Sequence, residues 1–217
     1  MSQMTSKLRS DYFAEGDYVV TDPGKGVMRS RASTRMVALT EDFLRGLREA
    51  LDSECGPGAD LVLRTCGRAW GADFARRVEK ELSEFHGKPL QSEPLGSFEA
   101  SLTSLFSHHG WGATRFDFTQ HARGLIVVAV RDPVLAAAAS AESKSPGDPL
   151  LTGVLAGTFA HFTGQPLDCL QTECRSRGAA ESRFVIALAD RLKPLLGWPG
   201  QGKTHDEVVA ELARPPA

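Results

Sequence analysis

Cysteine and acidic side chains near residue 174 are the groups in this sequence that could form a metal site. Residues 170–174 read Leu-Gln-Thr-Glu-Cys, a glycine-bearing turn follows, and residues 184–188 are apolar. A structural zinc ion needs four ligands, usually several thiolates with imidazole or carboxylate groups. Cys169 lies five residues before Cys174, and an odd separation along a strand puts two side chains on opposite faces. The spacing therefore keeps these two thiols apart.

Tryptophan and histidine residues form a second group of candidates. Trp70 and Trp111 each lie next to glycine, which leaves room beside the indole ring for a flat apolar ligand. The alternative is a core or interface tryptophan whose N–H donates to a carbonyl group. His109 lies at the end of an expected helix, where it either contacts a ligand or complements the negative helix terminus. We predict an aromatic ligand site formed by Trp70, Phe106, His109, Trp111 and Phe159.

Motifs for catalysis or nucleotide binding are not evident in the sequence. It contains no Gly-x-Ser-x-Gly nucleophile elbow and no Gly-x-Gly-x-x-Gly dinucleotide fingerprint. Residues 22–26 and 200–206 contain Gly-Lys but lack the spacing and the strand–helix context of a phosphate-binding loop. We therefore expect a protein that is not an enzyme and that uses no cofactor.

The composition is that of an ordinary folded protein. Charged residues make up 24% of the chain and the hydrophobic class 41%, so a core can form without a disulfide or a metal. A net charge of −2 gives no basic face for nucleic acid. The longest apolar run, residues 124–130, is too short to span a bilayer. Without a signal segment or a disulfide-framework spacing of the four cysteines, we expect a cytoplasmic protein.

Four helices are predicted between residues 40 and 164, over residues 40–55, 59–86, 97–109 and 150–163. Thr40 is the expected N-cap of the first helix, and the glycines and proline of residues 56–58 end it. Apolar residues recur at three- and four-residue steps along each helix, which predicts one buried side. In the first helix that side consists of Phe43, Leu44, Leu47 and Leu51.

Glycine pairs mark the buried sides of two of these helices. Gly67 and Gly71 lie one turn apart on the second helix, and Gly153 and Gly157 do so on the fourth. A glycine inside a helix costs about 1 kcal/mol relative to alanine, so each pair indicates close approach of another backbone, such as that of a partner helix. We therefore predict a dimer interface that includes Gly67, Gly71 and Phe74.

Strand patterns occur in two pairs, and they predict an α+β fold. Residues 111–119 alternate apolar and polar side chains, and residues 125–130 read as a central strand covered on both faces. Residues 166–174 and 182–189 form the second pair across a turn. The expected architecture is an antiparallel sheet of two β-hairpins packed on one face against about four helices.

Three segments describe the expected domain organisation. Residues 1–35 are a polar N-terminal segment with one short strand, and residues 36–192 form the domain. Residues 131–149 are a loop within it. Residues 193–217 are a tail that ends in a short exposed helix before two prolines.

An ordered series of segments resembles the 4-vinyl-reductase domain family. The segments are GSFEASLTSLFSHHGWGATRFDF, GLIVVAVRDP and LLTGVLAGTFAHFTGQPLDCLQTECRSRGAAESRFVI, preceded by STRMVALTEDFLRGLREAL and CGRAWGADFA. The resemblance spans about residues 30–190. It implies a fold related to TRAPP-type vesicle-tethering subunits, a domain that dimerises through helices, and relatives among aromatic-responsive sensory domains and bacteriochlorophyll-synthesis proteins. A less extensive likeness is to the D-type subunit of bacterial cellulose synthase.

The resemblance also implies where a zinc ion would lie. In zinc-bearing sensory members of the family, the ligand positions correspond to Asp148, Gln171, Cys174 and Ser182 of this sequence. Only Cys174 keeps a thiolate, and Asp148 offers an oxygen donor, whereas neutral Gln171 and Ser182 supply no anionic charge. We predict that zinc is not bound here, that Asp148 and Cys174 are a remnant, and that Cys174 is a small buried thiol.

Three functions follow as hypotheses. The first is a sensory domain that binds a small apolar or aromatic ligand and self-associates as a homodimer or higher oligomer. The second is a structural or assembly subunit with a protein partner, as in cellulose-synthase complexes. The third is a reductase of a tetrapyrrole vinyl group, which rests on the family resemblance alone.

Overall fold

Two antiparallel sheets and a set of helices make up the computed structural model, which describes residues 12–13, 17–135 and 147–214. The main sheet has the strand order β4-β5-β7-β6. Its strands form two hairpins joined through β5 and β7, and their bounds are Ala113–Asp117 (β4), Ile126–Arg131 (β5), Leu167–Glu173 (β6) and Ser182–Leu188 (β7). Both predicted hairpins and the α+β class are therefore confirmed.

Cross-strand pairing sets which side chains of the main sheet enter the core. Val128 lies opposite Phe116 on one side and opposite Phe184 on the other, and all three are buried. Because side chains alternate between the two faces of a strand, these residues place one apolar row on the face that α3 and α5 cover. The predicted inward alternation in residues 111–119 is thus confirmed.

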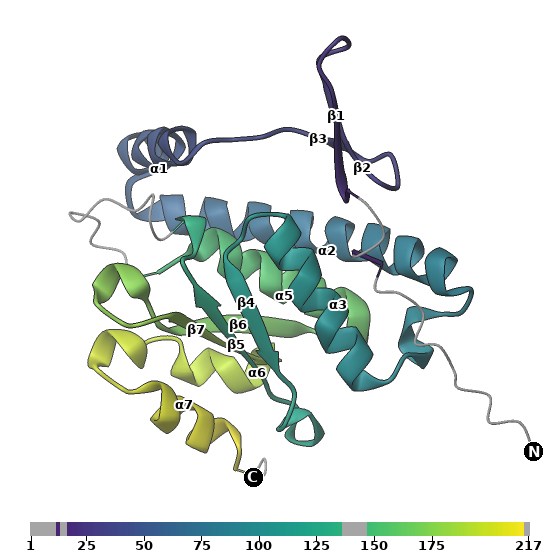
Figure 1. Ribbon diagram of the computed structural model, residues 1–217. Coiled ribbons are helices and arrows are strands. Elements are labelled where there is room, and N and C mark those ends of the chain that lie inside the picture. The colour runs from purple at the N-terminus through teal and green to yellow at the C-terminus, as the bar shows by residue number, and fades with distance from the viewer. Residues whose placement is uncertain (1–11, 14–16, 136–146, 215–217) are drawn as a thin grey trace, which may run out of the picture.

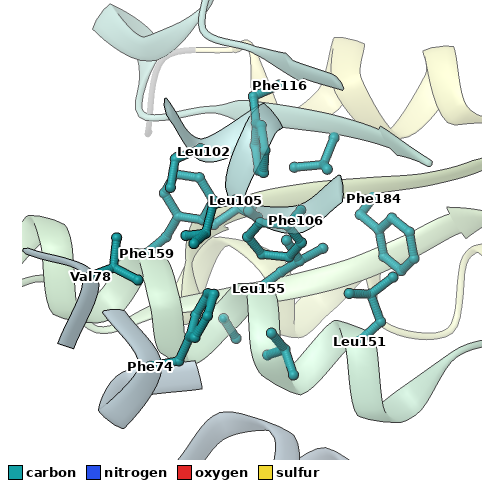
Figure 2. Close-up of a cluster of buried hydrophobic side chains, with 14 of the residues drawn as sticks. Phe74, Val78, Leu102, Leu105, Phe106, Phe116, Leu151, Leu155, Phe159 and Phe184 are labelled. Atoms are coloured by element: carbon teal, nitrogen blue, oxygen red, sulfur yellow. The ribbon is translucent and has the colours of Figure 1, made fainter. Parts of the chain in front are cut away.

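Three helices cover that face of the sheet in two layers (Figure 1). Helices α3 (Leu95–His108) and α5 (Pro149–Thr163) pack on the strands, and the long helix α2 (Ala59–His86) packs on α5. Figure 2 shows Phe106 of α3, Phe159 of α5 and Phe116 of β4 pointing into one cluster with Phe74 of α2. This cluster is the main hydrophobic core.

The α2–α5 contact is a backbone-to-backbone packing of two parallel helices. A methyl group at Gly67 would overlap the Leu150 carbonyl oxygen, and one at Gly71 would overlap that of Val154. In return, a methyl group on Gly153 or Gly157 would overlap backbone atoms of α2. The two predicted glycine pairs therefore face each other within one chain.

That arrangement corrects the predicted dimer interface. Gly67, Gly71 and Phe74 are buried against α5 and α3 of their own chain, so their side of α2 is already covered. The expectation of a close backbone was right, but the backbone is intramolecular. The sequence shows that a neighbour must come close and cannot show to which chain it belongs.

Two arginines tie α2 to the edge of the sheet. Arg64 and Arg68 both lie within ion-pair distance of Asp168 on β6, at 2.7 and 2.5 Å. They also donate to the carbonyl oxygens of Cys169 and Leu167. These partly buried charges fix the rotation of α2 about its axis, since each guanidinium group satisfies two acceptors in a set geometry.

The second face of the main sheet is covered by the C-terminal segment, which corrects two expectations. Helices α6 (Ala189–Leu192) and α7 (His205–Leu212) bury a separate apolar cluster against β6, β7 and the residue that precedes β5. Its members are Leu125, Leu170, Val185, Ala187, Leu192, Leu195, Val208 and Leu212. Helices therefore lie on both faces of the sheet, and α7 is packed rather than exposed. His205 anchors α7 through a 2.7 Å hydrogen bond with Thr172.

The N-terminal segment, in which the sequence predicted one short strand, contains a small three-stranded sheet. It consists of β1 (Val19–Asp22), β2 (Val27–Ser30) and β3 (Arg35–Met36). Tyr12 and Tyr18 anchor it to the body: Tyr12 donates to Glu81 at 3.4 Å, and the Tyr18 ring lies 5.4 Å from that of His109. Much of the predicted loop 131–149 and the chain end lie outside the described residues.

Helix α1 (Glu41–Cys55) forms as predicted but does not pack as predicted. The Thr40 side chain accepts from the Phe43 N–H, as expected for an N-cap, and the helix ends at Gly56. None of its residues is buried, and Phe43 and Leu47 are 53% and 41% exposed. Figure 1 shows α1 standing beside the body of the molecule. In the described ranges, no helix combines the length and the apolar content needed to cross a membrane.

Replacing Gly157 by alanine tests the α2–α5 contact. The added methyl group would meet backbone atoms of Arg68 and Ala72, which cannot turn aside as a side chain does, so we expect a loss of about 2–4 kcal/mol in the free energy of unfolding. Gly46→Ala is the matched control, because nothing lies within 4 Å of a methyl group there, and it should gain up to about 1 kcal/mol. Urea unfolding measures the stability of both variants, and equal changes in the free energy of unfolding would contradict the close α2–α5 contact.

Candidate functional site

An apolar cavity of about 560 Å³ lies at one end of the main sheet. It opens to solvent and is bounded by the start of α3, the end of α5 and the segment that joins β4 to β5. Four phenylalanine rings line it, from residues 98, 118, 159 and 162, together with Ile126 and Ile186. Its size lies in the range of sites that hold small organic molecules, which are mostly apolar with a few polar groups.

The phenylalanine rings hold one another in place around the cavity. Phe98 meets Phe162 edge-on at 5.2 Å between ring centroids, and Phe118 lies 6.1 Å from Phe159. Phe159 and Phe162 are three residues apart on α5, which places them on neighbouring positions of one helix face. Aromatic walls of this kind favour flat apolar ligands, because rings attract one another edge to face or in offset stacks.

Polar groups gather at the rim of the cavity. Glu93 pairs with Lys88 at 3.1 Å and Gln91 donates to Glu79. The hydroxyl group of Thr163 donates to the Phe159 carbonyl oxygen at 2.7 Å. The Nδ1 atom of His121 lies 2.7 Å from the carbonyl oxygen of Phe118. The cavity thus has an apolar interior and a polar rim, an arrangement that can orient a ligand with one polar end.

The residues predicted for the ligand site form a connected group of rings. Trp70 stacks on Phe74 at 4.6 Å and lies 5.3 Å from Trp111, while Phe74 meets His109 at 4.9 Å. Phe106 contacts both Phe74 and Phe116, and Phe116 contacts Phe159. Of the five predicted residues, Phe159 lines the 560 Å³ cavity, and the other four belong to the packed group beside it.

His109 and Trp111 are embedded at the end of α3. Burial lowers the pKa of His109 below its usual value, and its Nδ1 atom lies 3.0 Å from the Leu105 carbonyl oxygen. A neutral imidazole does not supply the positive charge that would complement the helix terminus. The Trp111 N–H is buried without a hydrogen-bond partner among the described residues, so the carbonyl expected for a core tryptophan is not there.

Most of the cavity wall was not singled out from the sequence. The periodic patterns placed Phe98 and Phe162 on inward helix faces and Phe118 on the inner face of a strand, and all three do point inward. The same patterns describe any core position, however. Whether rings meet each other or enclose a space depends on how three separate elements are spaced, which a periodic pattern does not contain.

A second cleft, of about 650 Å³, surrounds the expected zinc remnant. Asp148 caps α5 by accepting from the Leu151 N–H, and Gln171 accepts from the Asp148 N–H at 2.5 Å. Cys174 is buried, as predicted, with its sulfur 3.0 Å from the Ser176 hydroxyl group, and Ser182 accepts from the Arg175 N–H. Within the described ranges, no three His, Cys, Asp or Glu side chains converge as metal ligands.

The carboxyl group of Asp148 is the most strongly perturbed acid of this cleft. Burial raises its pKa from 3.8 to about 7, and its Oδ2 atom has no hydrogen-bond partner among the described residues. Because the folded pKa lies above the unfolded one, this residue favours folding while it is protonated. That contribution is complete below about pH 4 and is lost as the pH rises to about 7.

Asp148→Asn separates the capping role from the buried charge. Asparagine is an equally good N-cap and carries no charge, so we expect the variant to lose less stability than the wild type between pH 5 and pH 8. The difference should be on the order of 1–3 kcal/mol, measured by urea unfolding at each pH. The exposed Asp190 provides the control Asp190→Asn, which should follow the wild type. Parallel curves for Asp148→Asn and the wild type would contradict the buried charge.

Comparisons with known proteins give a structural match and no sequence match. No family model matches the chain, and no curated protein matches it significantly. The phenol-responsive sensory domain of the transcription activator PoxR, in a crystal structure with phenol, superposes with a TM-score of 0.65 at 15% identity, over 92% of this chain and 93% of that one. This match shows a common fold, and it confirms the fold resemblance expected from the sequence.

Two further structures are similar over a smaller part of this chain. A trafficking protein particle complex subunit 3 from Naegleria fowleri, covalently bound to palmitic acid, has a TM-score of 0.42 at 10% identity, over 67% of this chain and 94% of that one. A vinyl-4-reductase family protein from Methanocaldococcus jannaschii has a TM-score of 0.41 at 14% identity, over 70% and 95%.

Proposed function

We propose that the protein is a non-enzymatic receptor domain that binds a small apolar or aromatic compound in the phenylalanine-lined cavity. The observation that supports this function is the cavity itself: about 560 Å³ with four aromatic walls and a polar rim. The fold is also that of a domain described as phenol-responsive and crystallised with phenol. Each Å² of apolar ligand surface removed from water contributes about 25 cal/mol, so an apolar compound filling this space gains several kcal/mol.

Ligand occupancy is connected to helix packing through α5. The same helix supplies Phe159 and Phe162 to the cavity and Gly157 to the contact with α2. His161 of α5 also lies 2.6 Å from Glu79 of α2. A ligand that fixes the end of α5 therefore acts directly on the helix pair, which is the route by which binding would be read out elsewhere in a larger assembly.

Narrowing the cavity tests the binding site. Ile126→Trp places an indole ring in the cavity wall, and we expect it to weaken binding of aromatic compounds at least about tenfold, as measured by calorimetry and thermal shift. Val20→Trp is the control, because Val20 is 53% exposed on β1 and away from the cavity. Equal affinities for the two variants, or no binding of any aromatic compound to the wild type, would contradict the proposed function.

We also propose that the protein self-associates through α1. A 15-residue helix in isolation is marginally stable in water, yet α1 has one apolar side with no buried residue. Leu61 and Val62 at the start of α2 are likewise 68% and 45% exposed. In a symmetric dimer, the apolar side of α1 from each chain covers Leu61 and Val62 of the other chain.

The assembly-subunit alternative uses the same surface for a different protein. The two proposals differ in whether the purified chain self-associates in the absence of another protein. Phe43→Asp with Leu47→Asp should convert a dimer to a monomer at micromolar concentration, because each charge would be buried in an apolar interface. Sedimentation velocity measures this, with Glu49→Asp on the same helix as the control. A wild-type chain that stays monomeric at about 50 μM would favour the assembly alternative.

A further inference from the structure

Glu93 is the acidic side chain among the described residues that line the cavity. It lies two residues before α3, and only 10% of its side chain is exposed. Its Oε1 atom is buried and accepts no hydrogen bond within the described part of the chain. A carboxylate taken out of water is stable only when positive groups and hydrogen-bond donors compensate its charge. The cavity wall therefore contains an acceptor whose compensation is incomplete.

The positive groups near Glu93 come from outside the cavity. The Nζ atom of Lys88 lies 3.1 Å from Oε1 of Glu93, and the Nδ1 atom of His86 lies 3.9 Å from it. Neither residue is part of the cavity wall, and the Lys88 side chain is 47% exposed. An ion pair with a half-exposed lysine contributes little, because water and salt compete for its charge. Lys88 can therefore turn towards solvent at small cost when another cation approaches Glu93.

No other group of the wall competes with Glu93 for a positive charge. The described residues of the wall include no lysine and no arginine. Arg191, whose guanidinium group lies near Gly124 of the wall, donates to two backbone carbonyl oxygens. The other polar side chains of the wall are exposed at its rim, and they are Gln91, His121, Thr163 and Gln165. The nearly buried Glu93 thus sets the charge that a ligand meets.

The aromatic rings of the wall favour the same sign of charge. The face of a phenylalanine ring carries negative partial charge, and a cation placed over it within about 6 Å is attracted. Phe98, Phe118, Phe159 and Phe162 all line the cavity. A cation on an apolar body would gain from these rings and from the carboxylate together. An anion would be repelled by the carboxylate and by the ring faces.

We propose that the ligand is an apolar amine that is protonated at neutral pH. Its ammonium group donates to Oε1 of Glu93 in place of Lys88, and its apolar body lies among the phenylalanine rings. The inference rests on the proposed function and narrows it from apolar compounds in general to cationic ones. It makes Glu93 the residue that selects a cation over a neutral compound of the same shape.

Calorimetry of the full chain with three probes at neutral pH tests the ligand class. The probes are 3-phenylpropylamine, 3-phenylpropan-1-ol and 3-phenylpropanoate, which share one apolar body and differ in charge. The amine should bind at least about tenfold more tightly than the alcohol, because hydrogen bonds between charged groups are the stronger ones. The propanoate should bind most weakly. An alcohol or propanoate that binds as tightly as the amine would overturn this inference and leave the proposed function standing. If no probe binds, the proposed function fails as well.

Glu93→Gln tests the acceptor, because it keeps the shape of the side chain and removes its charge. The affinity for the amine should fall at least about tenfold, while the affinity for the alcohol should stay the same and thereby show that the cavity is intact. Glu99→Gln is the matched control, since Glu99 lies on α3 but outside the cavity wall. A preference for the amine that survives in Glu93→Gln would overturn the role of Glu93.

Lys88→Met tests whether the ligand takes the place of the lysine. With the competing cation removed, the amine should bind about threefold more tightly, and the alcohol should bind as it does to the wild type. A structural ion pair would give the opposite result. Weaker binding of the amine to Lys88→Met would therefore assign the Glu93–Lys88 pair to the support of the wall and overturn the inference.

Discussion

The fold depends on the contact of α2 with α5, where two parallel helices approach until their backbones touch. Four glycines make this distance accessible, and the Thr158 hydroxyl group adds a bond to the Gly71 carbonyl oxygen at 3.3 Å. As a result α5 is covered by α2 on one side and by the sheet on the other, and every residue from Leu151 to Phe159 is buried. A helix buried on all sides needs apolar and small residues throughout, which its sequence provides.

The cavity lies beside the last turns of α5, which stay in contact with α2 through His161 and Glu79. Gly157 is the last glycine of the contact, and beyond it α5 continues towards residues 159–163, where Phe162 and Thr163 are no longer fully buried. There the rings of Phe159 and Phe162 contact Phe118 and Phe98, and together these rings line the cavity. One helix therefore serves as the central support of the core with its first half and as the wall of a binding site with its second half.

The second cleft, which contains Asp148 and Cys174, is held together by hydrogen bonds. Where the resemblance implies zinc ligands, Asp148 and Gln171 are linked by a backbone-to-side-chain bond, and Ser182 accepts from the Arg175 N–H. Such neutral bonds can fix the same segments, the start of α5 and the β6–β7 turn, that a metal ion would otherwise join. The cost is a buried carboxyl group whose pKa is raised to about 7, and which therefore makes stability depend on pH near neutrality.

The sequence by itself determined the elements and most of their inward faces. Periods of two and of three to four residues located the four predicted helices and both hairpins, because these periods reflect which side of an element meets the core. The glycine pairs showed that backbones approach closely. The unalternating run of residues 125–130 showed a strand covered on both faces, as the burial of the adjacent residues Val128 and Ala129 demonstrates. The class of fold followed from the order of these elements.

Tertiary structure alone decided which elements meet. It placed Gly67 against α5 rather than a partner, left the amphipathic α1 uncovered, and packed α7 on the second face of the sheet. It also put the cavity at Phe98, Phe118 and Phe162 instead of at the two tryptophans. The reason is physical: a periodic pattern records that a side chain is buried, whereas the identity of its neighbour and the space left between neighbours depend on the distances between elements far apart in the chain.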